Sequence, residues 1–163
     1  PGLRENFIER VFACKRLRGL MANAQGRGDL VAFHTRHKLQ IMAHSPQLYR
    51  EIGRLVADKS DEPFTDLLCR YARLFSKALG LKATTKKHVN VLSHIMGYFK
   101  RQLTPDEKQE LIELIAQYAQ GLVPLIVPLT LLGHYVRKYD QAYLKDQTYL
   151  CPHPKELALR NHV

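Results

Sequence analysis

Two segments of this sequence carry side chains that could do chemistry on an otherwise apolar, helical framework. They are residues 33–44 (FHTRHKLQIMAH) and residues 86–101 (KKHVNVLSHIMGYFKR), and together they contain five of the eight histidines. An imidazole, amide, phenol or cation costs free energy when it is buried without a partner, so a helix that only packs does not need such groups. We therefore expect these side chains to meet a polar, anionic ligand.

The second segment separates into a polar face and an apolar face at helical spacing. At 100° per residue, one arc of about 100° holds the polar, cationic and glycine positions, and the opposite arc holds apolar residues. The first arc consists of Lys87, Asn90, His94, Gly97, Tyr98 and Arg101; the second consists of Val89, Leu92, Ile95, Met96 and Phe99.

This polar face has the groups that recognise RNA. Cations at both ends of the segment suit phosphate oxygens. Asn90 and His94 can hydrogen-bond a base edge or a ribose hydroxyl, and Tyr98 can stack on an unpaired base. A helix face that is only solvated usually intersperses Asp or Glu, and residues 85–103 contain neither. The pattern therefore favours RNA over a merely basic, solvated face.

The histidines of the first segment leave several interpretations open. His34, His37 and His44 fall within an arc of roughly 80° on a helix, which invites a metal ion. However, His37 and His44 are separated by a rise of about 10.5 Å, too far for one ion bonded at about 2 Å. The alternatives are a metal-dependent hydrolase that also uses His94, histidines held by structural hydrogen bonds, and histidines that face a phosphate or a base.

The charge distribution agrees with a polyanionic partner. The chain has a formal net charge of +10, and residues 1–103 carry 19 basic and 8 acidic side chains. Residues 104–121 are instead acidic, with one basic and four acidic side chains. Such an asymmetry predicts one face that binds a polyanion and one plain solvated face. A basic protein without such a partner is the simpler alternative.

Length, composition and missing motifs argue against several other classes of protein. A chain of 163 residues fits one domain, and no apolar run reaches the roughly 18 residues of a membrane span. Three widely spaced cysteines, Cys14, Cys69 and Cys151, do not form a CxxC pair. They argue against a disulfide framework, a zinc ribbon or an iron–sulfur site in this chain, and they favour the reducing cytoplasm. The sequence has no phosphate-binding loop, nucleophile elbow or dinucleotide-binding turn.

The periodicity predicts an all-α, single compact domain of about seven helices followed by an extended tail. Asp29, Ser45, Thr84 or Thr85, and Thr104 are the expected helix caps. The expected helices cover residues 3–21, 29–44, 46–58, 63–79, 85–101 and 105–120, and a last one begins at Pro124 or Val127 and ends at Tyr139.

Long motifs of the chain resemble the YbgA family of bacterial helical domains. The similarity covers nearly all of residues 3–160. The motifs that carry it are LVAFH (30–34) with its continuation to Lys38, MAHSP (42–46), YR (49–50), HVNVL (88–92), residues 94–100, GLVPLIVPLTLL (121–132) and the stretch 143–154.

The resemblance implies a function in tRNA metabolism. Members of the family occur alone or fused behind a cysteine-rich desulfidase domain of the TudS type, which holds an iron–sulfur cluster. In the fused proteins, of the RudS type, the pair is linked to the removal of sulfur from 4-thiouridine in tRNA, and the YbgA-like half is the tRNA-binding part. Residues 1–24 then correspond to a junction helix, and residues 25–163 to the helical core and C-terminal tail. This chain lacks the cluster-ligating cysteines, so we expect no cofactor here and a cluster in the partner domain.

Together, the residues and the resemblance predict a tRNA-binding accessory domain that is not catalytic by itself. Its partners are tRNA and a desulfidase domain in cis or in trans, with no membrane. A protein-docking module, with an exposed apolar rather than cationic patch, is a further alternative. The residues expected to bind the nucleic acid are Arg36, His37, Lys38, His44, Arg50, Lys86, Lys87, Asn90, His94, Tyr98, Lys100 and Arg101.

Overall fold

Side chains at the segment boundaries begin several helices where the sequence predicts. Ser45 precedes Pro46 and accepts a hydrogen bond from the backbone N–H of Leu48. Thr84 accepts one from the N–H of Lys87. Thr104 forms a reciprocal capping box with Glu107. Asp29 is not a cap, because its helix begins at Arg27 and its carboxylate accepts from the N–H of Gln25 instead.

The computed structural model describes residues 2–152, with side chains from residue 4, and shows eight helices and no strand in this range. The predicted all-α class is confirmed. The helices are α1 (Gly2–Asn23), α2 (Arg27–His44), α3 (Pro46–Ala57), α4 (Phe64–Gly80), α5 (Thr85–Tyr98), α6 (Pro105–Ala119), α7 (Ile126–Lys138) and α8 (Ala142–Lys145).

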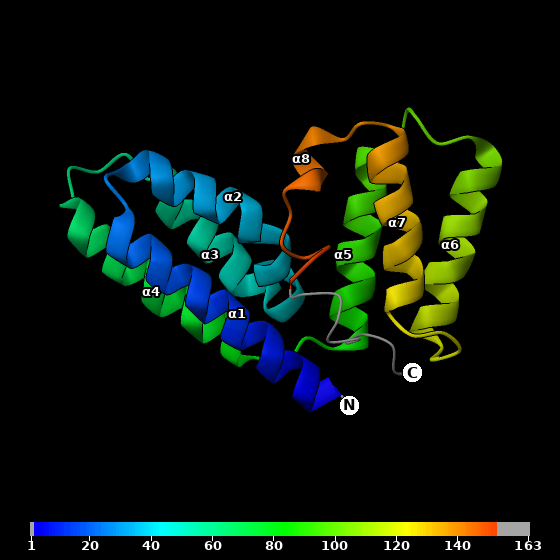
Figure 1. Cartoon of the computed structure of the whole chain (residues 1–163), viewed down its shortest axis with the longest axis horizontal. Coiled ribbons are helices and arrows are strands. Elements are labelled where there is room, and N and C mark those ends of the chain that lie inside the picture. Colours follow the sequence, from blue (N-terminus) through cyan, green and yellow to red (C-terminus); the bar gives the residue numbers. More distant parts are fainter. Residues whose placement is uncertain (1, 153–163) are drawn as a thin grey trace.

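The helices form two halves that share α2 (Figure 1). Helices α1 to α4 lie together, and α5 to α8 lie beside them. One apolar cluster joins α1–α4 and includes Phe33 and Ile41 of α2. The other joins α5–α8 and includes Leu39 and Met42 of the same helix. Because α2 contributes to both clusters, most of its surface is inside the protein.

Two elements differ from the predicted boundaries. Helix α5 ends at Tyr98, so Lys100 and Arg101 lie in a turn in which Phe99 accepts backbone hydrogen bonds from Gln102 and Leu103. The stretch expected to be extended contains the short helix α8. The rest of the expected tail, from residue 153, lies outside the described residues. Within residues 2–152, no helix combines the length and apolarity needed to cross a membrane.

The segment after α8 is attached to α2. The backbone N–H of Thr148 donates to the carbonyl of Arg36 at 2.9 Å, and the Gln147 side chain donates to the carbonyl of Thr35 at 2.7 Å. Tyr149 is fully buried, and its hydroxyl is 2.8 Å from Nδ1 of His88 in α5. These contacts fix the side chains of α8 and residues 147–149 against the two segments that the sequence singles out.

Candidate nucleic-acid interface

The polar face of α5 is exposed along most of its length. Asn90, His94 and Tyr98 are exposed, whereas Leu92 and Ile95 on the other side are completely buried. The helical spacing of apolar residues therefore oriented this helix as predicted. It places an amide, an imidazole and a phenol in a row on the surface, each about one turn from the next.

Tyr98 belongs to a group of four side chains from three helices, which we call the aromatic platform: Lys38, His94, Tyr98 and Tyr143. The rings of Tyr98 and Tyr143 stack with their centroids 5.0 Å apart and an interplanar angle of 19°. His94 meets Tyr98 edge-on at 5.7 Å, and Nζ of Lys38 lies 5.0 Å from the Tyr143 ring centroid. The platform thus combines a cation from α2, the polar face of α5 and a tyrosine of α8.

The electrostatics of the platform suit a neutral stacking surface beside a positive charge. Burial is the main cause that raises the pKa of both Tyr98 and Tyr143 above the usual value. Both phenols are therefore un-ionised at neutral pH and present no negative charge to an anionic ligand. Tyr98 is 37% exposed, so part of its ring remains accessible.

The predicted cations divide into different environments. Lys86 and Arg101 are exposed near the two ends of α5, and Arg50 is exposed on α3. Lys100 instead borders a separate cavity of about 210 Å³ together with Lys108 and residues 93, 96, 97, 99 and 103. Arg36 is exposed but projects about 160° away from Lys38 around α2. The structure therefore brings Lys38, His94 and Tyr98 together and leaves Arg36 and Lys100 on other surfaces.

Lys87 has a structural environment that the helical spacing did not reveal. Its ammonium donates to the carbonyl of His44 at 2.7 Å and to the carbonyl of Lys82 at 2.8 Å. The carbonyl groups at a helix C-terminus have no partner within the helix. Lys87 satisfies one of these groups at the end of α2, so its charge is directed inward rather than to a ligand.

His37 and His44 are inside the protein, with exposures of 1% and 0%. Nδ1 of His37 donates to the carbonyl of Phe33 at 2.8 Å, and its Nε2 accepts from Nε of Arg16 at 3.1 Å. Nδ1 of His44 lies 2.7 Å from the carbonyl of Leu81. The expected direct contact of these two imidazoles with sugar or base is therefore not part of the function proposed below. The physical reason is that α2 packs on both apolar clusters.

The burial and the hydrogen bonds of these histidines also determine whether they could bind a metal ion. Burial is the largest cause that lowers the pKa of His34 and of His37 to about 4, so both rings are neutral at pH 7. Each ring nitrogen of His37 already has a hydrogen-bond partner and is not available to a metal ion. Among the described residues, no three His, Cys, Asp or Glu side chains are grouped to hold one ion.

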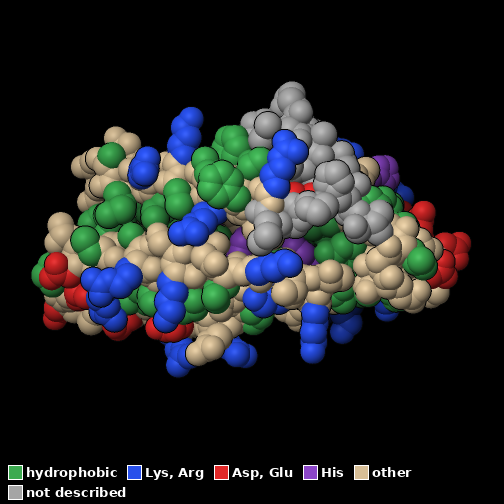
Figure 2. All heavy atoms as spheres, turned by 90° about the horizontal axis from the view of Figure 1, so that it is seen from below, with side chains coloured by type: hydrophobic (Ala, Val, Ile, Leu, Met, Phe, Trp, Pro, Cys, Tyr) green, Lys and Arg blue, Asp and Glu red, His purple; other side chains and the backbone are tan. Residues whose placement is uncertain are grey.

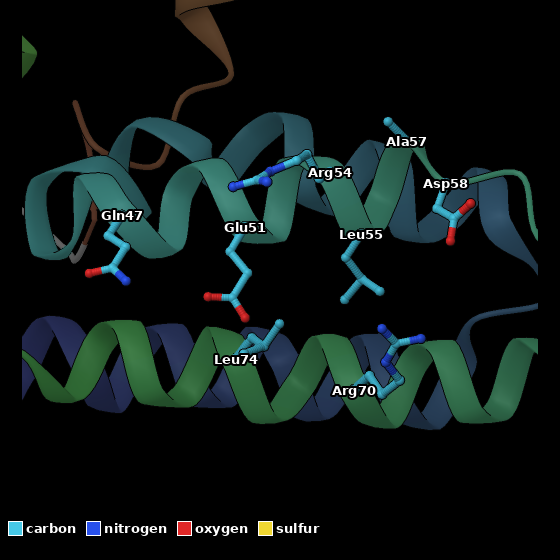
Figure 3. Close-up of a pocket in the computed structure, with 8 residues that line it drawn as sticks. All are labelled: Gln47, Glu51, Arg54, Leu55, Ala57, Asp58, Arg70 and Leu74. Atoms are coloured by element: carbon cyan, nitrogen blue, oxygen red, sulfur yellow. The ribbon is translucent and has the colours of Figure 1, made fainter.

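A cavity of about 730 Å³ lies between α3 and α4 (Figure 3). Side chains of both signs line it. Arg70 reaches toward it from α4 but is ion-paired with Glu62 at 2.9 Å, and Glu51 and Asp58 contribute carboxylates. The lining therefore contains two arginines, Arg54 and Arg70, and two carboxylates. Because it has no excess of positive charge, this groove does not extend the candidate interface.

Basic side chains are spread over one face of the molecule. Figure 2 shows Lys and Arg along most of this face, while Asp and Glu gather toward its two ends.

Part of the negative charge of the acidic helix α6 is paired with groups of the protein itself. Glu107 accepts from Nζ of Lys138 at 2.6 Å and from the Tyr139 hydroxyl at 2.5 Å.

Tyr143 was not among the residues predicted from the sequence. It lies in the stretch expected to be extended, and neither helical spacing nor a charge pattern marks it. Only the packing of α8 beside α5 and α2 places its ring on Tyr98.

The fold and this surface define a basic, all-helical domain with an exposed aromatic platform. Residues 38–154 match the family described as "Protein of unknown function (DUF1722)". Over 158 residues the chain is 35% identical to the "Uncharacterized protein YbgA" of Escherichia coli (strain K12), covering 96% of this chain and 94% of the relative. The chain therefore belongs to this YbgA-like family. No solved structure matches it.

Proposed function

We propose that this chain is a tRNA-binding domain that presents thiolated tRNA to an iron–sulfur desulfidase domain, which removes sulfur from 4-thiouridine. The observation that carries the proposal is the aromatic platform, in which exposed Tyr98 is stacked on Tyr143 beside the Lys38 ammonium. The resemblance of the sequence motifs to the tRNA-binding half of the fused desulfidases supports tRNA as the RNA that this chain binds.

The groups around the platform have complementary tasks. The tyrosine pair offers a flat surface to an unpaired base, and stacking of this type contributes about 1–3 kcal/mol per base. His94 and Asn90 supply hydrogen-bonding groups for a base edge or a ribose hydroxyl. Lys38, Lys86 and Arg101 supply positive charge for the phosphates on either side. The single-stranded or looped parts of a tRNA are therefore the expected ligand.

The desulfidase domain is expected to act in cis or in trans. In the E. coli relative, 94% of the chain is covered by the match, so there a desulfidase domain would have to come from another protein. Helix α1 offers a surface for such a partner because Phe7, Val11 and Met21 are 66%, 49% and 46% exposed. Its other side packs in the core through Ala13 and Leu17. This exposed apolar surface also keeps the protein-docking alternative open.

A filter-binding titration with tRNA tests the platform. Tyr98→Ala should weaken the affinity about tenfold through lost stacking, whereas Tyr98→Phe keeps the ring and should bind nearly as wild type. His134→Ala, which removes an exposed imidazole from α7, is the matched control for His94→Ala. Circular dichroism melting checks that the variants are folded.

Equal affinities of Tyr98→Ala, His94→Ala and wild type would exclude this surface. The docking alternative predicts a different result. Capture of the desulfidase partner would then survive nuclease treatment and be lost on Phe7→Ser with Val11→Ser, while tRNA affinity would be absent in all variants.

A further inference from the structure

A second basic site lies between α1, α2 and the segment after α8. It is a cavity of about 280 Å³ lined by Arg16, Gly19, Leu20, Phe33, Arg36, His37 and Thr148. This volume is just below the roughly 300–1,000 Å³ of pockets for drug-sized ligands, so it suits a small group rather than a whole nucleotide. No Asp or Glu is among the described residues that line it.

Arg16 carries an unused hydrogen-bond donor in this pocket. Its Nε donates to His37 Nε2 at 3.1 Å, and its Nη1 donates to the carbonyl of Pro152 at 3.1 Å. Its Nη2 is buried and has no hydrogen-bond partner among residues 2–152. A buried donor without an acceptor is unfavourable, most of all on a charged group. The guanidinium is thus held in place by two bonds while one nitrogen lacks an acceptor.

Arg36 adds a second guanidinium to the same pocket. The residue is exposed, and its side chain makes no hydrogen bond or ion pair with the described residues. The two arginines are close enough for their charges to interact, since Arg36 contributes to lowering the pKa of Arg16, after the larger effect of burial. The carboxylate that opposes these effects is Glu9, on α1, which does not line the pocket. The pocket therefore has an excess of positive charge, which a bound anion would neutralise.

We propose that this pocket binds a phosphate group, which accepts hydrogen bonds from Nη2 of Arg16 and from the guanidinium of Arg36. Planar guanidinium groups match phosphate oxygens in geometry and charge. Leu20 and Phe33 provide an apolar wall. The site is separate from the aromatic platform and does not depend on it. The phosphate belongs either to an RNA backbone or to a small phosphorylated compound.

Inorganic phosphate is the first probe, in a thermal-shift titration at constant pH and ionic strength with chloride as the comparison salt. Wild type should show a saturable rise in Tm, and the apparent Kd should weaken about tenfold in Arg36→Ala, through the loss of a charge-assisted hydrogen bond. Arg36 is exposed, so the variant should fold. Arg18→Ala removes an exposed arginine from α1 and is the matched control.

Phosphate also stabilises proteins without binding them, by exclusion from their surface. An identical or non-saturable rise in wild type, Arg36→Ala and Arg18→Ala would therefore overturn the proposal, as would no rise at all. Arg16→Lys, which keeps the charge but removes Nη2, should also weaken the saturable effect.

Parallel binding experiments with tRNA identify the source of the phosphate. If the RNA backbone supplies it, Arg36→Ala should weaken tRNA binding and inorganic phosphate should compete with tRNA. If a small compound supplies it, tRNA affinity should be unchanged in both tests, while the saturable phosphate effect persists. A failure of the tRNA proposal would leave the phosphate titration informative, because that titration uses no RNA.

Discussion

Lys87 illustrates how a side chain on a predicted binding face can serve the fold. Together with Asn90 and His94 it shares the polar arc of α5, yet its long side chain folds back to the end of α2 and the loop before α5. Helical spacing gives the direction in which a side chain leaves the helix, but it does not give the partner that a flexible chain of four methylenes reaches.

We predict that Lys87→Met lowers the free energy of unfolding by about 2 kcal/mol. The ammonium makes two charged hydrogen bonds to carbonyls, and bonds of this kind contribute about 1.5–3 kcal/mol. Lys86→Met, at an exposed neighbouring position, is the control and should change stability little. Urea denaturation measures both. A Lys87→Met variant as stable as wild type would mean that the two bonds contribute nothing.

The buried histidines predict a loss of stability at acidic pH. The pKa of His34 and His37 is lowered from 6.5 to about 4, chiefly by burial. As the pH falls, the unfolded chain therefore takes up protons near 6.5, while the folded chain resists them until about 4. The stability is complete above pH 6.5 and declines toward pH 4, by about 1–2 kcal/mol per histidine at pH 5.

Urea denaturation at pH 7.5 and pH 5 measures this decline. In His34→Phe, the free energy of unfolding should differ less between the two pH values than in wild type, because one proton-binding group of the unfolded chain is gone. Nδ1 of His34 lies 3.4 Å from the hydroxyl of Tyr71. Because the two pH values are compared within each protein, the loss of this contact does not affect the result. An equal difference in both proteins would contradict the assignment of His34 to this pH dependence.

At the scale of the elements, the junction between α2 and α3 depends on one hydroxyl. Ser45 is 6% exposed, and its Oγ accepts from the N–H of Leu48. Ser45→Ala should lower the free energy of unfolding by about 1 kcal/mol, the usual contribution of an N-cap. Differential scanning calorimetry measures this loss, and tRNA affinity should not change. Ser93→Ala, on the exposed side of α5, is the control.

These elements also show what a sequence can and cannot predict. Caps such as Ser45 and Thr104 and the exposed face of α5 are local features, and they were predicted correctly. The end of α5 was placed too late because the sequence KR after Phe99 does not interrupt the helical pattern. The sequence left open whether the α2 histidines are buried or face a ligand, because their burial requires two separate clusters to enclose one helix. The role of Tyr143 depends on packing between segments about 45 residues apart.

At the scale of the whole molecule, basic and acidic side chains are concentrated in different helices. The basic residues of α1–α5 leave a surface with a large positive excess, and α6 carries the main acidic stretch. Some of these acidic groups are engaged, since Glu107 meets Lys138 and Tyr139, and Glu110 accepts from the Tyr135 hydroxyl at 3.3 Å. A long-range field from the first half is therefore expected to steer a polyanion to the protein.

The binding of tRNA to the basic surface should weaken as the salt concentration rises. If Lys38, Lys86 and Arg101 each contact a phosphate, the logarithm of the binding constant should fall with the logarithm of salt concentration with a slope of about −2 to −3. Lys86→Gln with Arg101→Gln removes two contacts and should reduce the slope by about 1.5. Arg73→Gln with Lys77→Gln removes the same charge from α4, on the other half of the molecule. If both double variants reduce the slope equally, binding follows net charge alone; if only the α5 pair does, the contacts are local to the platform.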